Sequence, residues 1–184
     1  MLKIYTARCA RFHLPRRLID LDGFGAKSQE KILEGIRLVK KSQGHFLIDF
    51  AKGESEKLIS YLKKQKGISK IEIAGSLRRQ KEIIKDIDIL VSAQKPAQIH
   101  EAFVKYPEAQ SVAAHGDTKS SIVLKTGIAC DLRTVTEEEF PAALYYFTGS
   151  KEHNVAVRTL AKKKNIKVNE YGLFKGEKRI PCKS

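Results

Sequence analysis

The sequence predicts an α+β protein with a helical N-terminal region, a sheet-rich centre and a small mixed α/β C-terminal part. Apolar residues recur at helical spacing between residues 18 and 66. From residue 68 onward apolar and polar residues alternate, as they do in half-buried strands. The expected parts are residues 1–66, 67–136 and 137–184.

The composition bounds the class of protein. The chain has 184 residues, of which 42% are hydrophobic, enough to bury one sizeable core. Its 35 Lys and Arg against 21 Asp and Glu leave a net charge of +14, which favours a polyanionic partner such as nucleic acid. No apolar run of about 18 residues or signal-peptide core is found, so no membrane association is expected.

The cysteines indicate a reducing compartment. Cys9, Cys130 and Cys182 are odd in number, far apart and without CxxC spacing. They therefore indicate neither a disulfide framework nor a zinc site. A cytoplasmic location, close to the nucleoid in a bacterium, is expected.

The N-terminal region is predicted to be all helical. In the segment at 18–40, a tight turn at Gly23-Phe24-Gly25 separates a short helix from a second, amphipathic one. The segment ESEKLISYLKKQKG continues with helical spacing and is expected to end at Gly67.

The centre is predicted to be a mixed or antiparallel sheet with covering helices. The segments KIEIAG, DIDILVS, SSIVLKTG and ACDLRTV have strand character, and AQIHEAFVKY has helical character. Two helices follow, separated at 148–150, with Ser150 as the N-cap of the second. Short strands with a turn at Gly176 are expected to end the chain.

Two acids in the segment DIDIL are candidate metal ligands. Asp86 and Asp88 leave one face of the predicted strand while Ile87 and Ile89 point to the core. Carboxylates this close repel unless a cation neutralises them, and hard oxygen ligands on a rigid strand suit Mg²⁺. The alternative is an exposed strand face with two solvated acids.

A phosphate site is predicted one short loop away. Gly75 and Ser76 fall where a strand ends and a basic segment begins. Free amides, a hydroxyl and the guanidinium of Arg78 or Arg79 can hold a phosphate at such a point. This combination of phosphate site and metal site is more specific than either part.

A third acid, Asp131, alternates with Cys130 and Leu132 on another predicted strand. It can join the two acids of DIDIL if the strands are neighbours. The alternative is an ion pair with Arg133 on the sheet surface.

The segments AGSLRRQKEIIKDIDILV, DLRTV, YYFTGSKEHN and NEYGLF, in this order, resemble the family X DNA polymerases of the bacterial type, which are similar to DNA polymerase beta. The resemblance implies a helix-hairpin-helix region, then a nucleotidyltransferase palm sheet, then a small α/β thumb-like subdomain that binds the nascent base pair. Asp86, Asp88 and Asp131 match the family's metal-binding catalytic acids. They would hold two Mg²⁺ ions, or Mn²⁺ in their place.

The same resemblance implies the nucleotide and DNA contacts. Positions that match nucleotide-binding residues are Gly75, Ser76, Arg79, Tyr146, Phe147, Gly149, Ser150 and Asn154. Arg158 matches a template contact. As alternatives, Tyr146 and Phe147 could be core aromatics and Arg158 a solvated helix charge.

The segment LDGFGAKSQEKI resembles the helix-hairpin-helix motif. Amides of the turn from Gly23 to Gly25 would contact a DNA phosphate, often with a monovalent cation, and Lys27 would add charge. Such a contact is independent of sequence.

The chain also departs from the family. Lys85 stands where some relatives have glycine, and Ala129 stands where DNA polymerase beta has arginine. No counterpart is seen for the lyase domain, the phosphoesterase domain or the last thumb residues. Lyase activity is therefore not expected, and the chain is either a natural minimal form or a fragment.

Three functions fit these observations to different degrees. The first is a monomeric template-directed DNA polymerase that adds dNTPs in short gaps of gapped or primed DNA, as in base excision repair. The alternative is a DNA-binding fragment of such an enzyme with little or no catalysis. A nucleotidyltransferase acting on RNA or a small molecule is disfavoured by the hairpin and by YYFTGS, and the presence of all the acids favours the first.

Overall fold

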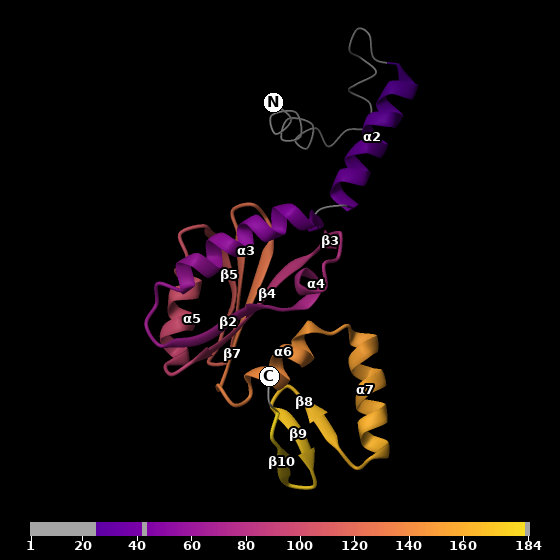
Figure 1. Ribbon diagram of the computed structural model, residues 1–184. Coiled ribbons are helices and arrows are strands. Elements are labelled where there is room, and N and C mark those ends of the chain that lie inside the picture. The colour runs from indigo at the N-terminus through magenta and orange to yellow at the C-terminus, as the bar shows by residue number, and fades with distance from the viewer. Residues whose placement is uncertain (1–24, 42–43, 183–184) are drawn as a thin grey trace. The chain divides into compact units, whose positions relative to one another are not determined.

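The computed structural model describes residues 25–41 and 44–182 (Figure 1). The chain forms two compact units, which divide between Gln43 and Gly44. In the first unit, helix α2 (Ala26–Lys41) begins directly after Gly25, whose carbonyl accepts hydrogen bonds from the amides of Ser28 and Gln29 at 3.0 and 3.1 Å. This is the place of the second helix of the predicted hairpin. The first helix and Gly23 lie outside the described residues.

The second unit is built around a mixed sheet of five strands in the order β2-β4-β7-β6-β5. The strands are β2 (Ile68–Ile73), β4 (Asp86–Ala93), β5 (Ala109–His115), β6 (Lys119–Leu124) and β7 (Ala129–Val135). Strands β4 and β7 are parallel, and the other neighbours are antiparallel. The prediction of a mixed sheet is therefore confirmed, but β5 was not predicted.

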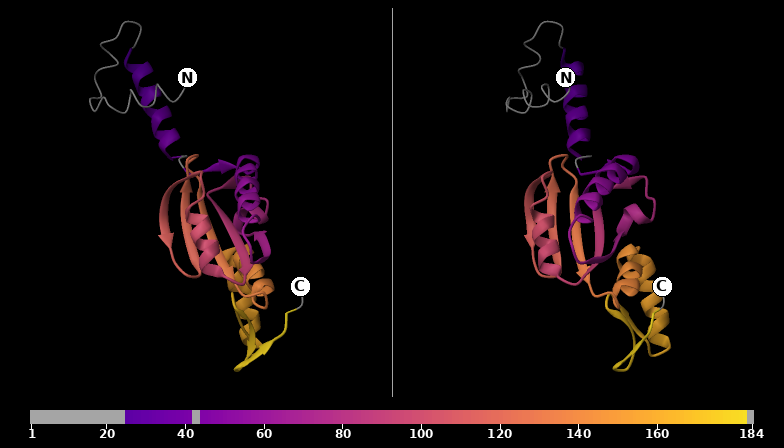
Figure 2. Two further views of the ribbon diagram at one scale, coloured as in Figure 1. Left: turned by 90° about the vertical axis from the view of Figure 1, so that its left-hand side faces the viewer. Right: turned by 60° about the vertical axis from the view of Figure 1, so that its left-hand side comes forward.

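Two helices cover one face of this sheet (Figures 1 and 2). They are α3 (Ile48–Leu62) and α5 (Pro96–Val104). Their fully buried residues Leu58 and Phe103 belong to the same cluster as Ile87 and Leu132 of the sheet. Each such side chain contributes roughly 1.5–3 kcal/mol on burial. Period-2 alternation therefore places every second residue of β4, β6 and β7 in this core.

The prediction that residues 1–66 are all helical is wrong in two places. Phe46–Leu47 forms a short strand, β1, which pairs with β3 (Ile83–Ile84). Helix α3 ends at Leu62, so residues 63–66 are turn and bend. The partner of β1 lies far along the chain, and a local period cannot reveal such a pairing.

The other face of the sheet is only partly covered. Helix α4 (Gly75–Arg78) and helix α6 (Phe140–Thr148) contact β4 there. Phe140 and Ala143 pack on Leu90, and this explains why Leu90 is buried although it lies on the face opposite to Ile89 and Val91. Four successive residues of β4, at 89–92, are buried. The start of β4 stays accessible on this face.

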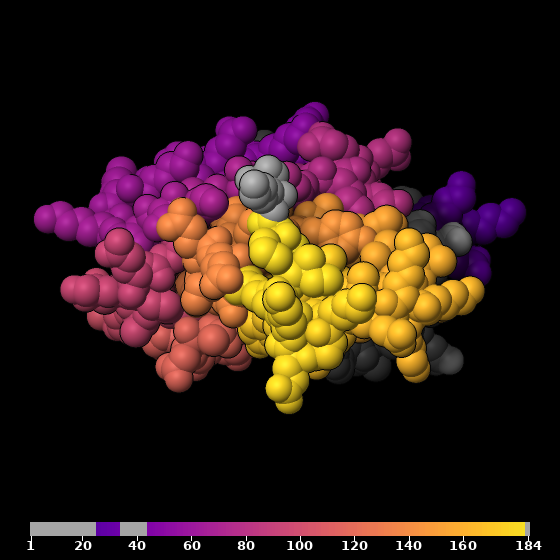
Figure 3. Space-filling view, turned by 60° about the horizontal axis from the view of Figure 1, so that its bottom comes forward, coloured from indigo at the N-terminus to yellow at the C-terminus, as the bar shows by residue number. Residues whose placement is uncertain are grey.

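The C-terminal part combines helix α7 (Lys151–Lys163) with a three-stranded antiparallel sheet. Its strands are β8 (Lys167–Asn169), β9 (Gly172–Lys175) and β10 (Lys178–Ile180). Seen from the side of these strands, α7 lies beside them on the surface (Figure 3). The predicted N-cap is confirmed, since Ser150 Oγ accepts a hydrogen bond from the amide of His153 at 3.4 Å. Gly176 supplies the predicted turn with φ of +61°.

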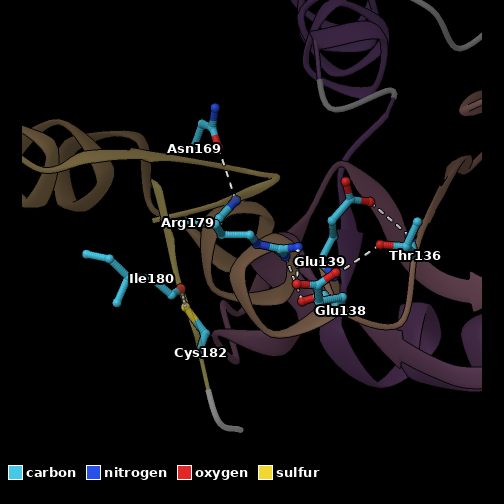
Figure 4. Close-up of polar contacts among 8 residues, drawn as sticks. Thr136, Glu138, Glu139, Asn169, Arg179, Ile180 and Cys182 are labelled. Carbon is cyan, nitrogen blue, oxygen red and sulfur yellow. Dashed lines mark hydrogen bonds and ion pairs between the residues drawn. The ribbon is translucent and has the colours of Figure 1, made fainter. Parts of the chain in front are cut away.

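The segment that leads from β7 into α6 is held by reciprocal hydrogen bonds (Figure 4). The amide of Thr136 donates to Glu139 Oε2 at 3.0 Å, and the amide of Glu139 donates to Thr136 Oγ1 at 3.3 Å. This is a capping box. Arg179 of β10 pairs with Glu138 at 2.8 Å and donates to its carbonyl at 2.9 Å, so the small sheet is attached to the same segment.

Among the described helices, none is both long and apolar enough to cross a membrane.

Candidate active site

The acids predicted as metal ligands share one face of the large sheet. In the parallel pairing of β4 and β7, Asp88 lies directly opposite Asp131. Asp86 is two residues before Asp88, so it leaves the same face. The intervening Ile87 and Cys130 are fully buried on the opposite face. The predicted gathering of these carboxylates on one face is therefore observed.

The site is electrostatically crowded. Burial, together with the neighbouring charges of Asp86 and Asp131, raises the pKa of Asp88 to about 6, while the positive charges of Arg133 and Lys119 oppose this rise. Asp86, in contrast, is exposed. A partly buried carboxylate flanked by two others favours a bound cation.

Gly75 makes the approach of α4 to the acids possible. Its φ is +59°, and a Cβ atom at this position would lie 1.9 Å from Asp88 Oδ2. The amide of Ala74 donates to the Asp88 carbonyl at 2.8 Å, which fixes the chain beside β4. Only glycine meets both conditions without displacing Asp88.

An open cleft joins the acids to the turn between α6 and α7. It is lined by Gly75, Ser76, Arg79, Asp86, Asp88, Tyr146, Phe147, Gly149, Ser150, Lys151, Asn154 and Arg158. All eight residues predicted to bind nucleotide are among them, together with Arg158. Asp131 does not line this cleft but a separate small hollow, which it shares with Asp88, Arg133 and Phe147.

Several buried polar atoms of the cleft are unpartnered within the described part of the chain. They are Ser76 Oγ, Arg79 Nε and Asn154 Oδ1. Arg79 Nη1 donates to the carbonyl of Thr148, and Asn154 Nδ2 donates to the carbonyl of Tyr146 at 2.7 Å. Buried polar groups are normally paired, so a polar ligand is the natural partner for the free atoms.

The aromatic pair lines the cleft, and Phe147 also packs against the buried cluster of Leu90, Phe140 and Ala143. Tyr146 and Phe147 are half-buried, and their rings meet edge to face with centroids 5.4 Å apart. The guanidinium of Arg133 lies over the Phe147 ring at 4.4 Å. Arg133 is thus engaged away from Asp131, whose partner is Lys119 at 2.6 Å. The alternative of an Asp131–Arg133 ion pair is not observed.

The donor set fits Mg²⁺ or Mn²⁺ by its chemistry. Carboxylates are the hard ligands that these ions take, and the unpartnered Ser76 and Arg79 atoms fit the phosphates that usually complete the shell. No group of three acid, histidine or cysteine side chains among residues 25–41 and 44–182 is by itself arranged to hold an ion. Asp86, Asp88 and Asp131 are therefore neighbours rather than a preformed cage.

The predicted hairpin residues belong to the other compact unit of the chain. Gly25 and the exposed Lys27 are in the first unit, and Gly23 lies outside the described residues.

Two basic residues near the acids and the cleft were not predicted from the sequence, Lys119 and Lys151. The sequence alone does not single out Lys119, because its contact with Asp131 depends on how β6 pairs with β7.

Comparison with known proteins adds the family. The family model described as DNA polymerase beta thumb matches residues 143–184. The DNA polymerase/3′-5′ exonuclease PolX of Bacillus subtilis (strain 168) is 40% identical over 160 residues, which are 86% of this chain. The chain spans 28% of the length of that relative.

Viral relatives are matched over most of their length. Repair DNA polymerase X of African swine fever virus (isolate Tick/Malawi/Lil 20-1/1983) is 30% identical over 150 residues, 71% of this chain and 84% of the viral protein. For the Badajoz 1971 Vero-adapted strain the identity is 31% over 161 residues, with coverage of 83% and 86%.

A solved structure shares the fold. The ternary P/T complex of Leishmania infantum polymerase beta matches with a TM-score of 0.67 at 20% identity, over 91% of this chain and 89% of that one. The mixed α/β architecture is thus that of the polymerase beta class. Within it, the chain belongs to the family X DNA polymerases and is of the bacterial type.

Proposed function

We propose that this chain catalyses template-directed addition of dNTPs to a primer 3′-hydroxyl in short gaps, as part of DNA repair by base excision. The observation that carries the proposal is the cleft itself. Its unpartnered Ser76, Arg79 and Asn154 atoms lie on the same surface as the carboxylates of Asp86 and Asp88. This is the combination that nucleotidyl transfer needs, since a triphosphate must be held beside metal ligands.

The phosphate end of the nucleotide is assigned to α4. Ser76 Oγ and Arg79 Nε are free to donate to phosphate oxygens, and the glycine at 75 lets the backbone come close. Asp86, Asp88 and Asp131 would hold two Mg²⁺ ions, with Mn²⁺ as a substitute. When bound, these ions supply charge stabilisation for the triphosphate and for the attacking 3′-hydroxyl.

The sugar and base are assigned to the α6–α7 turn. Tyr146 and Phe147 would flank the sugar next to Gly149 and Ser150. Asn154 Oδ1 is unpartnered and can accept from the base edge. Arg158, one helical turn further on α7, is exposed on the cleft and is assigned to the template.

The DNA partner is supported by charge and by relatives. The net charge of +14 suits phosphate contacts. Two relatives are described as repair polymerases, and the solved structure is described as a P/T complex. Gapped or primed DNA is the proposed substrate, with a helix-hairpin-helix contact through Gly23, Gly25 and Lys27 and a monovalent cation there. A monomer in the cytoplasm is the proposed working form.

Primer extension across a one-nucleotide gap tests this proposal. Four gapped duplexes that differ in the template base are each offered the four dNTPs with Mg²⁺, and with EDTA as control. The proposal expects addition of the complementary nucleotide in each duplex and none in EDTA. Addition that ignores the template base would indicate a different nucleotidyltransferase.

The second candidate is a DNA-binding protein without catalysis. Salt-sensitive binding to the gapped duplexes with no addition to any of them would establish it and would overturn the polymerase proposal.

A further inference from the structure

Lys119 forms an ion pair with one of the proposed catalytic acids. Its Nζ lies 2.6 Å from Asp131 Oδ2. Among the ion pairs of the described residues, neither Asp86 nor Asp88 has a partner. Lys119 thus forms its ion pair with a single member of the acid group, although its charge also acts on Asp88.

The pairing of β6 with β7 explains this contact. The side chains of Ser120 and Ile122 are buried on the face of the sheet that α3 and α5 cover. Lys119 and Ser121 therefore lie on the opposite face, together with the acids. Ser121 is directly opposite Asp131, and Lys119 is its diagonal neighbour, at a separation that a long side chain spans. The two side chains are 39% and 22% exposed, so the pair is partly shielded from water.

Within the described structure, Lys119 is the basic side chain that forms an ion pair with Asp131. Ala129 precedes Asp131 on the same face of β7 and cannot donate. Arg133, on the other side, is stacked on Phe147. The basic partner of Asp131 therefore comes from the neighbouring strand. It takes one carboxylate oxygen and leaves the other available.

We propose that Lys119 is a positioning residue for Asp131. By holding Oδ2 it sets the direction of the carboxylate, so that the other oxygen faces the cleft when the divalent ions and the primer are bound. This inference rests on the proposed polymerase function. Partners that orient a ligating carboxylate commonly affect metal affinity or activity by about 10–100-fold.

Two effects of removing Lys119 oppose each other. Loss of a positive charge a few ångströms from the site should strengthen binding of a divalent cation, and loss of orientation should weaken it. The repulsion between the Lys119 charge and a bound cation is larger than the energy of one rotamer preference of Asp131. The net effect of removing Lys119 should therefore be tighter cation binding. Turnover should nevertheless fall, because the Asp131 carboxylate is no longer held with its other oxygen toward the cleft. Opposite changes in affinity and turnover are the signature of the proposal.

The experiment compares Lys119→Met with wild type by two readouts. Mn²⁺ binding to the protein without DNA is followed by electron paramagnetic resonance, and turnover is measured by gap filling at saturating Mg²⁺. We expect the Mn²⁺ Kd to fall about threefold to tenfold and kcat to fall about 10–100-fold. KM for dNTP should change less than about twofold, because Lys119 does not line the cleft. Lys119→Arg should restore most of the turnover.

A matched control is Lys125→Met. Lys125 follows directly after β6 and pairs with Glu108 at 3.5 Å. Lys125→Met should therefore change neither the Mn²⁺ Kd nor kcat. Lys119→Met should also have no further effect on turnover when Asp131 is already Asn, because the two residues act as a pair.

The remaining outcomes overturn the proposal. Tighter Mn²⁺ binding with unchanged or higher kcat would make Lys119 a mere competitor of the metal. Weaker Mn²⁺ binding, or a variant that matches Lys125→Met, would also refute it while leaving the polymerase function intact. A wild type that neither binds Mn²⁺ nor extends a primer would refute both proposals together.

Discussion

Gly75 meets two requirements that no other residue can meet. Its backbone has a positive φ, and a methyl group there would occupy the position of Asp88 Oδ2. We therefore predict that Gly75→Ala lowers gap-filling kcat at least about 100-fold and costs about 1–3 kcal/mol of stability. Single-turnover extension and urea unfolding measure the two effects.

Gly53 provides the matched control. It lies inside α3, and a Cβ at this position meets nothing within 4 Å. Gly53→Ala should stabilise the protein by about 0.5–1 kcal/mol without changing turnover. Full activity of Gly75→Ala would contradict the assignment of α4 as the element that holds the phosphates beside Asp88.

His100 makes stability depend on pH. It is buried and hydrogen-bonded to Ser120 and Thr134, both at 2.9 Å, and burial lowers its pKa below the ordinary 6.5. As the pH falls through 6.5, His100 therefore takes up a proton in the unfolded chain while it stays neutral in the folded chain. Stability should be constant above that pH and fall below it, with a slope approaching about 1.4 kcal/mol per pH unit.

Denaturant unfolding of wild type and His100→Gln at pH 7.5 and pH 5 measures this contribution. Wild type should lose more stability than the variant over this interval. His100→Gln can itself change stability at pH 7.5, so the two proteins are compared by how much each loses between pH 7.5 and pH 5. Equal losses in the two proteins would mean that folding does not shift the pKa of His100.

At the scale of the element, the capping box before α6 depends on only two residues, Thr136 and Glu139. Glu139→Ala removes the acceptor for the Thr136 amide and should cost about 1 kcal/mol. Glu139→Gln keeps an acceptor and should cost a few tenths at most. Urea unfolding of both variants compares them, and an equal loss would show that the charge matters rather than the hydrogen bond.

Elements with a strong local period were predictable from sequence. The alternation of DIDILV and ACDLRTV predicted both the buried residues and the shared face of the acids, and Ser150 predicted the start of α7. In these segments packing and local preference agree. The cleft residues of α6 and α7 were instead predicted from the family resemblance, since no local period marks them.

Elements that depend on a distant partner were not predictable. Strand β1 exists through its pairing with Ile83–Ile84, and β5 is a largely exposed edge strand whose register shifts twice against β6. The Lys119 contact is of the same kind, because it depends on which residue of β6 faces β7. Register is a tertiary property, and a single strand does not reveal it.

At the scale of the whole molecule, the excess of positive charge predicts how DNA binding responds to salt. Each neutralised phosphate releases counterions, so log K should fall linearly with log salt. Lys27→Ala should reduce the magnitude of the slope by about 1 if Lys27 contacts a phosphate. Fluorescence anisotropy with gapped DNA measures the slope.

Lys105 is the control for this charge effect. It lies just after α5, on the covered side of the sheet, and pairs with Glu101 at 2.6 Å. Lys105→Ala should leave the slope unchanged. The same slope for wild type and Lys27→Ala would remove the hairpin from the proposed DNA interface.

The central claim is that Asp86, Asp88 and Asp131 form one site for nucleotidyl transfer. Single-turnover filling of a one-nucleotide gap by Asp131→Ala tests it most directly, with Asp117→Ala as the control, since Asp117 lies in the loop before β6. The account predicts a loss of at least about 1,000-fold for Asp131→Ala and little change for Asp117→Ala, with DNA binding retained in both. Extension by Asp131→Ala at the wild-type rate would contradict it.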